Sequence, residues 1–320
     1  FFDIAIDNNL NLMKPAQSLN YITCRSLEGI REDLKKNTPK MVFIQGDTTT
    51  AFSAALASFY EKIPVGHVEA GLRTESLFDP FPEEANRRLI SQISSMHFAP
   101  TKQSKNNLIR AGVLGDIHVT GNTGIDSLLL ASEKVDDFCL DSIDWDRQKI
   151  ILTTIHRREN WGFGIKNVCL ALIKILNKFS DVSLILPLHP NPEVQKDVKH
   201  YLGNHSRAVL LDALPYDQLV AVMKKCFLVI TDSGGLQEEA PSFGKPVLVT
   251  RKTTERQEAV DAGTAKLVGI DTDFIVKEVE NLIINQRTYN KMSKINNPFG
   301  DGKASKRIIS EFLKKYNNLK

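Results

Sequence analysis

The stretch "TDSGGLQEEAPSFGKPVLV", Thr231–Val249, is the most informative about the fold, because it joins the end of an apolar run to the start of a helix. The preceding run, "CFLVI" (Cys226–Ile230), is typical of a buried strand, and Asp-Ser-Gly-Gly follows it. Free backbone N–H groups at the N-terminus of a helix favour an anion. The glycines at Gly234 and Gly235 would let a bulky anion come close to this backbone.

Two adjacent carboxylates, Glu238 and Glu239, follow the glycines roughly one helical turn later. They lie too far along the helix to contact a phosphate, but a carboxylate at this depth can accept hydrogen bonds from both hydroxyls of a ribose. The pattern therefore indicates a nucleoside diphosphate. An ordinary strand-to-helix turn, with an N-cap and no ligand, is the alternative.

Length and composition exclude several classes of protein. The chain of 320 residues, 42% hydrophobic and 25% charged, is long enough for two globular domains. A net charge of +3 is too small to indicate a nucleic acid or a membrane surface as partner. The four cysteines form no Cys-x-x-Cys pair, so they indicate neither a zinc site nor a disulfide framework, and a reducing cytoplasm is expected. No apolar run reaches the roughly 18 residues of a membrane-spanning helix.

Short β-branched runs alternate with longer helical patterns along the whole chain. Continuous apolar runs separated by helix-length spacers predict parallel sheets that are covered on both faces. The runs in the first half are "MVFIQGD", "PVGHVEA", "MHFAPT" and "DIHVTGN". Those in the second half are "KIILTTIH", "VSLILPLHP", "AVLLDAL", "CFLVITDSG", "KPVLVT" and "AKLVGI". The sequence therefore predicts an α/β protein.

A weakly patterned acidic stretch, "EKVDDFCLDSIDWDR" (Glu133–Arg147), separates the two sets of runs, and a new strand begins at Ile150. The expected first domain covers residues 1–146, and the expected second domain covers residues 147–302. The C-terminal helix, 303–320, is expected to pack back on the first domain. Both domains should be Rossmann-like with a cleft between them, and the ligand crevice of such a sheet lies at the carboxyl ends of its strands.

Polar and charged side chains stand at the ends of nearly all these predicted strands. They include Asp47, Glu69, Arg73, His156, Arg157, Arg158 and His189. Glu83 and Arg87, at positions i and i+4, share one face of the helix that Pro82 and Glu83 are expected to open. Each residue alone has an ordinary explanation as a cap, a surface ion pair or a structural histidine. Carboxylates and cations gathered at strand ends on one side of two sheets, however, are typical of an active site.

Several long motifs occur together in the order and at the spacing of one known family. They are "GDTTT", "HVEAGLRT", "PFPEEANRRL", "GNTGID", "HRREN", "TDSGGLQEEAPSFGKPVLV", "TTERQEAVDAGTAKLVG" and "NPFGDGKAS". In these motifs the chain resembles the non-hydrolysing UDP-N-acetylglucosamine 2-epimerases across nearly its whole length. Gln257 stands where that family usually has proline. The family's first strand and its Gly-Thr-Arg-Pro-Glu loop are expected upstream of Phe1.

The resemblance implies a GT-B fold, which consists of two Rossmann-like domains with the nucleotide mainly on the second. It implies interconversion of UDP-GlcNAc and UDP-ManNAc with no redox cofactor and no metal. It also implies a cytoplasmic enzyme, expected as a homodimer, that supplies ManNAc precursors for cell-surface polysaccharide. Neither a nucleic acid nor a membrane is expected as a partner.

The chemistry of this reaction can be compared with the residues independently. The C2 hydrogen of the sugar is not α to a carbonyl, so a carboxylate can remove it only if the C1–O bond to UDP stretches first. The reaction needs a base on one face of C2, an acid on the other, and stabilisation of the departing diphosphate. Asp47, Glu69 and Glu83 are the candidate acids and bases, and the resemblance implies the same three.

The resemblance also implies the binding residues. It places His156 and the Ser233-Gly234-Gly235 turn at the diphosphate and Glu239 on the ribose. Arg87 would offset the charge of the leaving group.

Bacterial members of the family bind a second UDP-GlcNAc as an activator. The resemblance places Glu83, Arg157 and His189 near it. The role of Glu83 is therefore open between catalysis and activation.

Three alternative functions fit part of the pattern. A GT-B glycosyltransferase would share the fold and the nucleotide helix, but it gives no reason for carboxylates clustered around C2. A hydrolysing 2-epimerase would release free ManNAc and is often followed by a sugar kinase domain; no such domain is expected here, which favours the non-hydrolysing type. A nucleotide-sugar binding protein without activity is the third.

Overall fold

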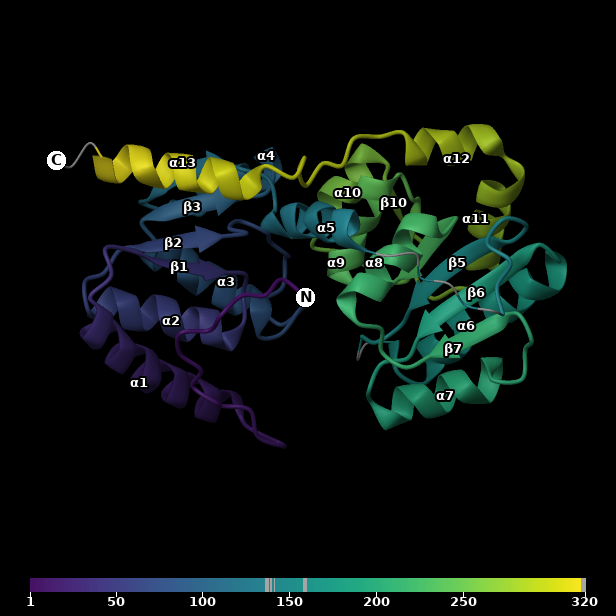
Figure 1. The fold of residues 1–320 in the computed structure, drawn as a ribbon, viewed down its shortest axis with the longest axis horizontal. Helices are drawn as coiled ribbons and strands as arrows, with labels where there is room; N and C mark the ends of the chain where they lie inside the picture. Colours follow the sequence, from purple (N-terminus) through teal and green to yellow (C-terminus); the bar gives the residue numbers. More distant parts are fainter. Residues whose placement is uncertain (136–137, 139, 141, 158–159, 318–320) are drawn as a thin grey trace. The chain divides into compact units, whose positions relative to one another are not determined.

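The computed structural model describes residues 1–135, 138, 140, 142–157 and 160–317. Arg158, a candidate at the end of a predicted strand, lies outside them. The chain divides into two compact units, each with one parallel sheet (Figure 1). The first unit comprises Phe1–Asp126 and Phe299–Lys320, and the second comprises Ser127–Pro298. The α/β class is confirmed, while the domain limits at residues 146 and 302 stay a prediction.

The sheet of the first unit has four parallel strands in sequence order, β1-β2-β3-β4. They are β1 (Val42–Gln45), β2 (Val65–Val68), β3 (Met96–Ala99) and β4 (Asp116–Val119). The helices are α1 (Leu19–Asn37), α2 (Thr49–Tyr60), α3 (Glu83–Ile93), α4 (Lys102–Arg110) and α13 (Ala304–Asn317), and the unit also holds the start of α5 (Thr123–Lys134). β2 and β3 are buried on both faces, as the uninterrupted apolar runs predicted.

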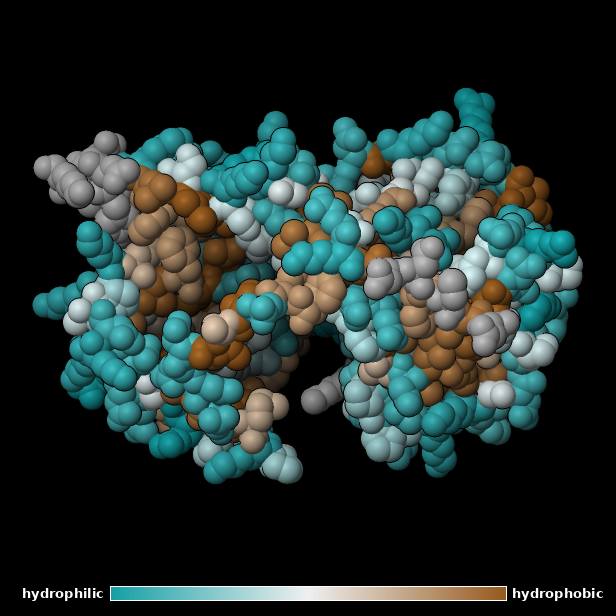
Figure 2. Space-filling model, in the orientation of Figure 1, coloured by the Kyte–Doolittle hydropathy of each residue, from teal (hydrophilic) through white to brown (hydrophobic). Residues whose placement is uncertain are grey.

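Different helices cover the two faces of this sheet. Ile44 and Val65 pack against α2 and α3, where Ile90 is fully buried. On the other face Phe98 packs against Ile308 of α13, and Asp126 accepts hydrogen bonds from the first N–H groups of that helix. Figure 2 shows apolar surface on this face, beside the place of α13 in Figure 1.

The sheet of the second unit has six parallel strands in the order β10-β9-β8-β5-β6-β7. They are β5 (Lys149–Thr154), β6 (Val182–Pro187), β7 (Ala208–Leu211), β8 (Leu228–Thr231), β9 (Val247–Val249) and β10 (Ala265–Leu267). With β5 counted as the first strand, this is the Rossmann order 3-2-1-4-5-6. The chain reverses its direction of travel across the sheet between β5 and β8, and an open crevice forms at such a point.

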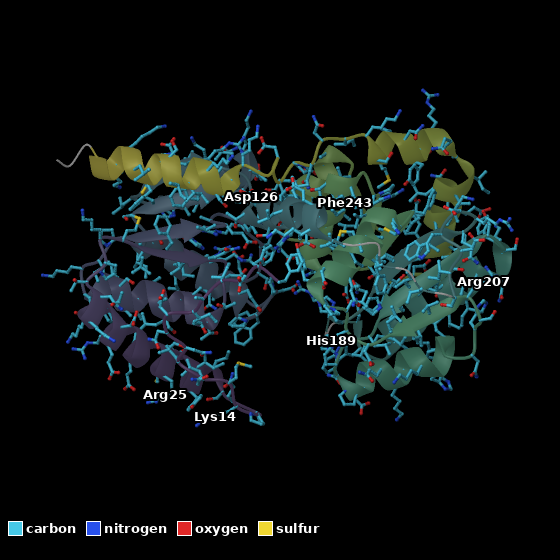
Figure 3. All side chains as sticks on the ribbon, viewed as in Figure 1. Lys14, Arg25, Asp126, His189, Arg207 and Phe243 are labelled. Atoms are coloured by element: carbon cyan, nitrogen blue, oxygen red, sulfur yellow. The ribbon has the colours of Figure 1, made fainter. Side chains whose placement is uncertain are left out.

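The helices of the second unit bury the sheet. They are α6 (Phe163–Lys178), α7 (Pro192–Leu202), α8 (Tyr216–Lys225), α9 (Gly234–Glu239), the 3-10 turn η2 (Ala240–Phe243), α10 (Gln257–Ala262), α11 (Thr272–Ile284) and α12 (Gln286–Ser293). One continuous apolar core joins α6, α7 and α11 to the strands. Figure 3 shows His189 and Arg207 at opposite ends of this sheet. The guanidinium of Arg207 donates at 2.7 Å to the backbone carbonyl of Phe179, which precedes β6, and Arg207 itself precedes β7. Arg207 therefore lies at the amino ends of these strands, and His189 lies at their carboxyl ends.

Two structural properties bear on the class of protein. Among the residues described, none of the helices combines the length and the apolar character needed to cross a bilayer. Within the same residues, no three His, Cys, Asp or Glu side chains are grouped so that they could hold a metal ion.

Candidate active site

A pocket of about 400 Å³ opens at the carboxyl ends of β5, β6 and β8 in the second unit. Its wall is made of Thr154, Ile155, His156, Pro187, Leu188, His189, Pro190, Ala213, Leu214, Leu219, Ser233, Gly235, Leu236 and Glu239. Five of the residues that the sequence singled out therefore line one cavity. The cavity lies at the reversal point of the sheet, where Rossmann-like folds bind nucleotides.

His156 and Asp232 form a hydrogen-bonded pair at the ends of β5 and β8. The Oδ1 atom of Asp232 lies 2.8 Å from Nδ1 of His156. Asp232 is fully buried and also accepts from the backbone N–H groups of His156 and Arg157 and from Nδ2 of Asn160. Burial alone would raise the pKa of Asp232, but these hydrogen bonds and the His156 ring hold it below its usual value.

His189 lies beside His156 in the pocket. The two imidazole rings stack with 5.8 Å between their centroids and 18° between their planes. Nδ1 of His189 accepts a hydrogen bond of 3.2 Å from the backbone N–H of Asn191. The pocket thus presents two imidazoles to a ligand from one wall.

The two glycines after β8 differ in their surroundings. Gly235 is exposed and lines the pocket, so a ligand can reach its backbone. Gly234 is buried, and a Cβ atom there would lie 3.0 Å from the guanidinium of Arg256 and 3.2 Å from Oε1 of Glu255. The small size of Gly234 therefore makes room for an ion pair, which the sequence did not predict.

Glu239 lies at the pocket wall, on the last residue of α9. Burial raises the pKa of Glu239 to about 7, against the lowering effect of a 3.3 Å hydrogen bond from the hydroxyl of Tyr216. Burial and the nearby Glu239 carboxylate in turn raise the pKa of Tyr216. A carboxylate that is costly to ionise in the free pocket gains most from a ligand that donates hydrogen bonds to it.

Arg157 belongs to a cluster of ion pairs behind the pocket. Its Nη2 atom lies 3.4 Å from Oε1 of Glu255. Arg256 contacts the same oxygen at 2.6 Å, and Arg251 contacts Oε2 of Glu255 at 2.8 Å. Burial opposes ionisation of Glu255, but the neighbouring arginines lower its pKa to about 2. Arg256 continues the cluster to Glu238 of α9 at 2.8 Å. Glu238 is thus held within the protein, while Glu239 faces the pocket.

In the first unit, Asp47 follows β1 and is held by α3. Nε of Arg87 donates to Oδ2 of Asp47 at 2.7 Å, and Asn86 donates to its backbone carbonyl at 2.8 Å. Arg87 is only 2% exposed, and its Nη1 atom donates to Glu84 at 2.8 Å. One buried arginine thus joins the Asp47 carboxylate to a second acid.

Glu69 follows β2, next to β1 in the sheet. Its φ of 66° is left-handed, which costs a residue with a Cβ atom free energy and is common at functional sites. A Cβ atom on Gly46 would lie 3.6 Å from Oε2 of Glu69, so this carboxylate approaches the loop that carries Asp47. His67 holds the same loop, because its Nε2–H donates to the carbonyl of Gly46 at 2.8 Å.

Glu83 and Glu84 begin α3 but have different environments. The Oε2 atom of Glu83 is buried and meets no hydrogen-bond partner among the described residues. Glu84 is fully buried and binds Arg87, Arg88 and the backbone N–H of Thr74. The sequence singled out Glu83 and missed Glu84, although the i, i+3 spacing of Glu84 and Arg87 was available as a signal.

Other polar residues of the site were also missed by sequence reasoning. They are Asp232, Asn160, Tyr216 and Asn86. Asp232 stands in the opening motif, at the end of an apolar run, and that position is the signal that could have found it. Tyr216 gave no signal, because its partner is 23 residues away.

Comparisons with known proteins show the family of this chain. The family model for UDP-N-acetylglucosamine 2-epimerase matches residues 1–313. The UDP-N-acetylglucosamine 2-epimerase of Escherichia coli K12 is 47% identical over 318 residues, which cover 96% of this chain and 84% of that protein. The crystal structure of UDP-GlcNAc 2-epimerase from Neisseria meningitidis, bound to UDP-GlcNAc, has a TM-score of 0.93 and 47% identity, covering 98% of this chain and 86% of that one.

A more distant structure shares the fold alone. It is a UDP-forming trehalose-phosphate synthase from Burkholderia xenovorans, with a TM-score of 0.62 at 11% identity. The two parallel sheets define a GT-B-like α/β protein. The chain belongs to the UDP-N-acetylglucosamine 2-epimerase family, as its motifs indicated, and it is an isomerase.

Proposed function

We propose that this chain, a UDP-N-acetylglucosamine 2-epimerase, interconverts UDP-GlcNAc and UDP-ManNAc by eliminating UDP and adding it back. A base removes the C2 proton while the C1–O bond breaks and its electron pair leaves with UDP. The C2–H electrons form the C1=C2 bond of 2-acetamidoglucal. UDP then adds back to C1, while an acid delivers a proton to the opposite face of C2.

The observation that carries this proposal is that one chain contains both a pocket with binding groups and carboxylates at strand ends. A pocket lined by His156, Ser233, Gly235 and Glu239 lies at the reversal point of one sheet. Asp47 and Glu69 follow adjacent strands of the other, and a buried arginine holds Asp47. A redox cofactor is not needed for this route, because no electrons are gained or lost overall.

The roles in the second unit follow from the chemistry of the pocket. His156 and the backbone at Ser233 and Gly235 bind the diphosphate, and Gly234 shapes the start of α9 beside them. Glu239 accepts hydrogen bonds from the ribose hydroxyls. The support for this assignment is that these groups line one cavity of nucleotide size.

The roles in the first unit concern the proton. Asp47, Glu69 and Glu83 serve as the acid and base on C2, and Arg87 offsets negative charge. The proximity of Glu69 to the Asp47 loop and the unpaired Oε2 atom of Glu83, among the described residues, support this choice.

A second molecule of UDP-GlcNAc as activator is part of the same proposal. Glu83, Arg157 and His189 would contact it, and the protein would act in the cytoplasm as a homodimer supplying ManNAc for cell-surface polysaccharide. The support is the family resemblance. For Arg157 the structure adds that Glu255 already engages part of the guanidinium.

One experiment tests the function. The protein is incubated with UDP-GlcNAc in D2O, and the sugar is followed by NMR. UDP-ManNAc with deuterium at C2 is the expected product. Free ManNAc would indicate a hydrolysing enzyme, and an unchanged sugar would refute epimerisation.

A further inference from the structure

We infer that Asp232 is a positioning residue that holds His156 with its ring proton on Nδ1 and leaves Nε2 free for the ligand. The inference deepens the proposed function and rests on it only in naming that ligand as a diphosphate. It assigns a role to a residue that lines no part of the pocket itself.

The contacts of Asp232 define the geometry. Its carboxylate accepts four hydrogen bonds from the segment after β5: the backbone N–H groups of His156 and Arg157 at 3.0 and 2.9 Å, Nδ2 of Asn160 at 3.0 Å, and Nδ1 of His156 at 2.8 Å. The backbone bonds place the segment, and the side-chain bond orients the ring. Trp161 adds a hydrogen bond from its indole to the carbonyl of His156.

The chemistry of a carboxylate decides the tautomer. An ionised carboxylate has no proton to donate, so the proton in the bond to His156 must sit on Nδ1 of the ring. Burial without pairing would favour a protonated Asp232, but its four donors stabilise the ionised form. The unprotonated nitrogen of neutral His156 is therefore Nε2.

His189 has the opposite tautomer. Its Nδ1 accepts from the backbone N–H of Asn191, so its own proton lies on Nε2. Of the two stacked rings, neutral His156 offers an acceptor and neutral His189 offers a donor.

The hydrogen bonds of the two rings leave different nitrogens available to the ligand. Nδ1 of His156 is engaged by Asp232 and Nδ1 of His189 by the backbone N–H of Asn191, so the ligand meets an Nε2 atom of each ring. A proton placed on Nε2 of His156 would break none of these bonds, whereas a proton on Nδ1 of His189 would break the bond to Asn191.

NMR of the wild-type protein gives the first test, without any variant. Ring 15N shifts distinguish the two tautomers, and the signals of His156 and His189 are assigned by their loss in His156→Gln and His189→Gln. We expect the ring proton on Nδ1 of His156 and on Nε2 of His189. His156 found as the Nε2–H tautomer would overturn the inference.

A double-mutant cycle gives the second test. Asp232→Asn should lower kcat by roughly 10²-fold or more in the wild-type background, because an amide can donate to Nδ1 and reverse the tautomer. In the His156→Gln background the same change should cost less than about 3-fold, because the ring is absent. Equal losses in both backgrounds would mean that Asp232 supports only the backbone, and the inference would fail.

The control is Asp273→Asn, the same chemical change at an exposed residue that pairs with Lys174. It should leave kcat and both tautomers unchanged. The NMR result does not depend on turnover. A wild-type protein with the expected tautomers and no epimerisation would therefore refute the proposed function and leave the positioning role intact.

Discussion

At the scale of single residues, the carboxylates after β1 and β2 have environments suited to different tasks. Asp47 is paired with the buried guanidinium of Arg87 at 2.7 Å. Glu69 has a strained backbone and lies against the Asp47 loop. Backbone strain of this kind is common at functional sites, and it supports the proposal that Glu69 transfers a proton at C2.

Asp47→Asn and Glu69→Gln keep the shape of the side chain and remove proton transfer. Each should lower turnover by roughly 10²–10⁴-fold. UDP affinity, measured by calorimetry, should change little, because neither residue belongs to the pocket of the second unit. Near-normal turnover of either variant would show that its residue is neither the acid nor the base.

If Glu239 binds the ribose as proposed, nucleotide binding should depend on pH. Its pKa is about 7 in the free pocket, so the ionised fraction rises from pH 6 to pH 8. Because the ribose hydroxyls need the ionised carboxylate as acceptor, binding should tighten by up to about tenfold over this range.

The measurement compares wild type with Glu239→Gln by calorimetry of UDP. UDP itself also titrates, and the difference between the two proteins removes that contribution. Glu239→Gln should bind UDP more weakly at pH 8 by roughly 1–3 kcal/mol and lose the extra pH dependence. Parallel curves for the two proteins would contradict the assignment of the ribose to Glu239.

At the scale of elements, α3 carries two neighbouring acids in different environments. Glu84 points into the unit and holds Arg87, and through Arg87 it fixes Asp47 at the end of β1. Glu83, one residue earlier, keeps an oxygen without a hydrogen-bond partner in the described part of the chain. The proposed function assigns structural support to Glu84 and chemistry to Glu83.

This separation predicts opposite phenotypes for two matched substitutions. Glu84→Gln breaks a buried ion pair and should lower the free energy of unfolding by about 3–5 kcal/mol. Glu83→Gln should cost less than about 1 kcal/mol of stability while lowering turnover by roughly 10²-fold or more. Urea denaturation and initial rates measure the two effects, and equal stability losses would refute the distinction.

At the scale of the whole molecule, the two units should differ in their response to acid. His67 and His97 pair in register on β2 and β3, and both are fully buried. Burial lowers the pKa of each ring to about 4. The unfolded chain takes up these protons near the ordinary histidine pKa of about 6.5, so the folded first unit should lose stability as pH falls from there towards 4.

Each histidine should lower the free energy of unfolding of the first unit by up to about 3 kcal/mol as the pH falls from about 6.5 to about 4. Hydrogen exchange of peptides from β2 and β3 reports the first unit, and fluorescence reports the second, because Trp145 and Trp161 both lie there. His97→Phe should reduce the slope of stability against pH by about 1.4 kcal/mol per unit. An unchanged slope would mean that His97 does not titrate in this way.

Much of this architecture could be predicted from the sequence. All ten predicted strands form, in parallel sheets, because uninterrupted apolar runs separated by helix-length spacers bury themselves well in few other ways. Asp47, Glu69, His156 and His189 could be selected because they are polar groups at the ends of apolar strands, where the ligand crevice of such a sheet lies. The catalytic and binding roles of these residues stay predictions.

The remaining features depend on partners that are distant in sequence. Gly234 pointed to a phosphate in the sequence, yet its nearest neighbours are Arg256 and Glu255, which come from the loop before α10. Glu239 meets Tyr216, from the first turn of α8. No local pattern contains such pairs, because each depends on how a helix packs after its strands have paired.

The strands, their parallel pairing and the family follow from the amino-acid sequence, because local hydrophobic runs and contiguous motifs encode each of them. The pairing of β8 with β5 became known from the fold, in which Thr154 contacts Thr231, 77 residues later. That pairing brings Asp232 to His156 and makes one site from two separate motifs. The physical reason is that strand order is set by hydrogen bonds and crossover helices between distant segments, which the pattern of any one segment does not encode.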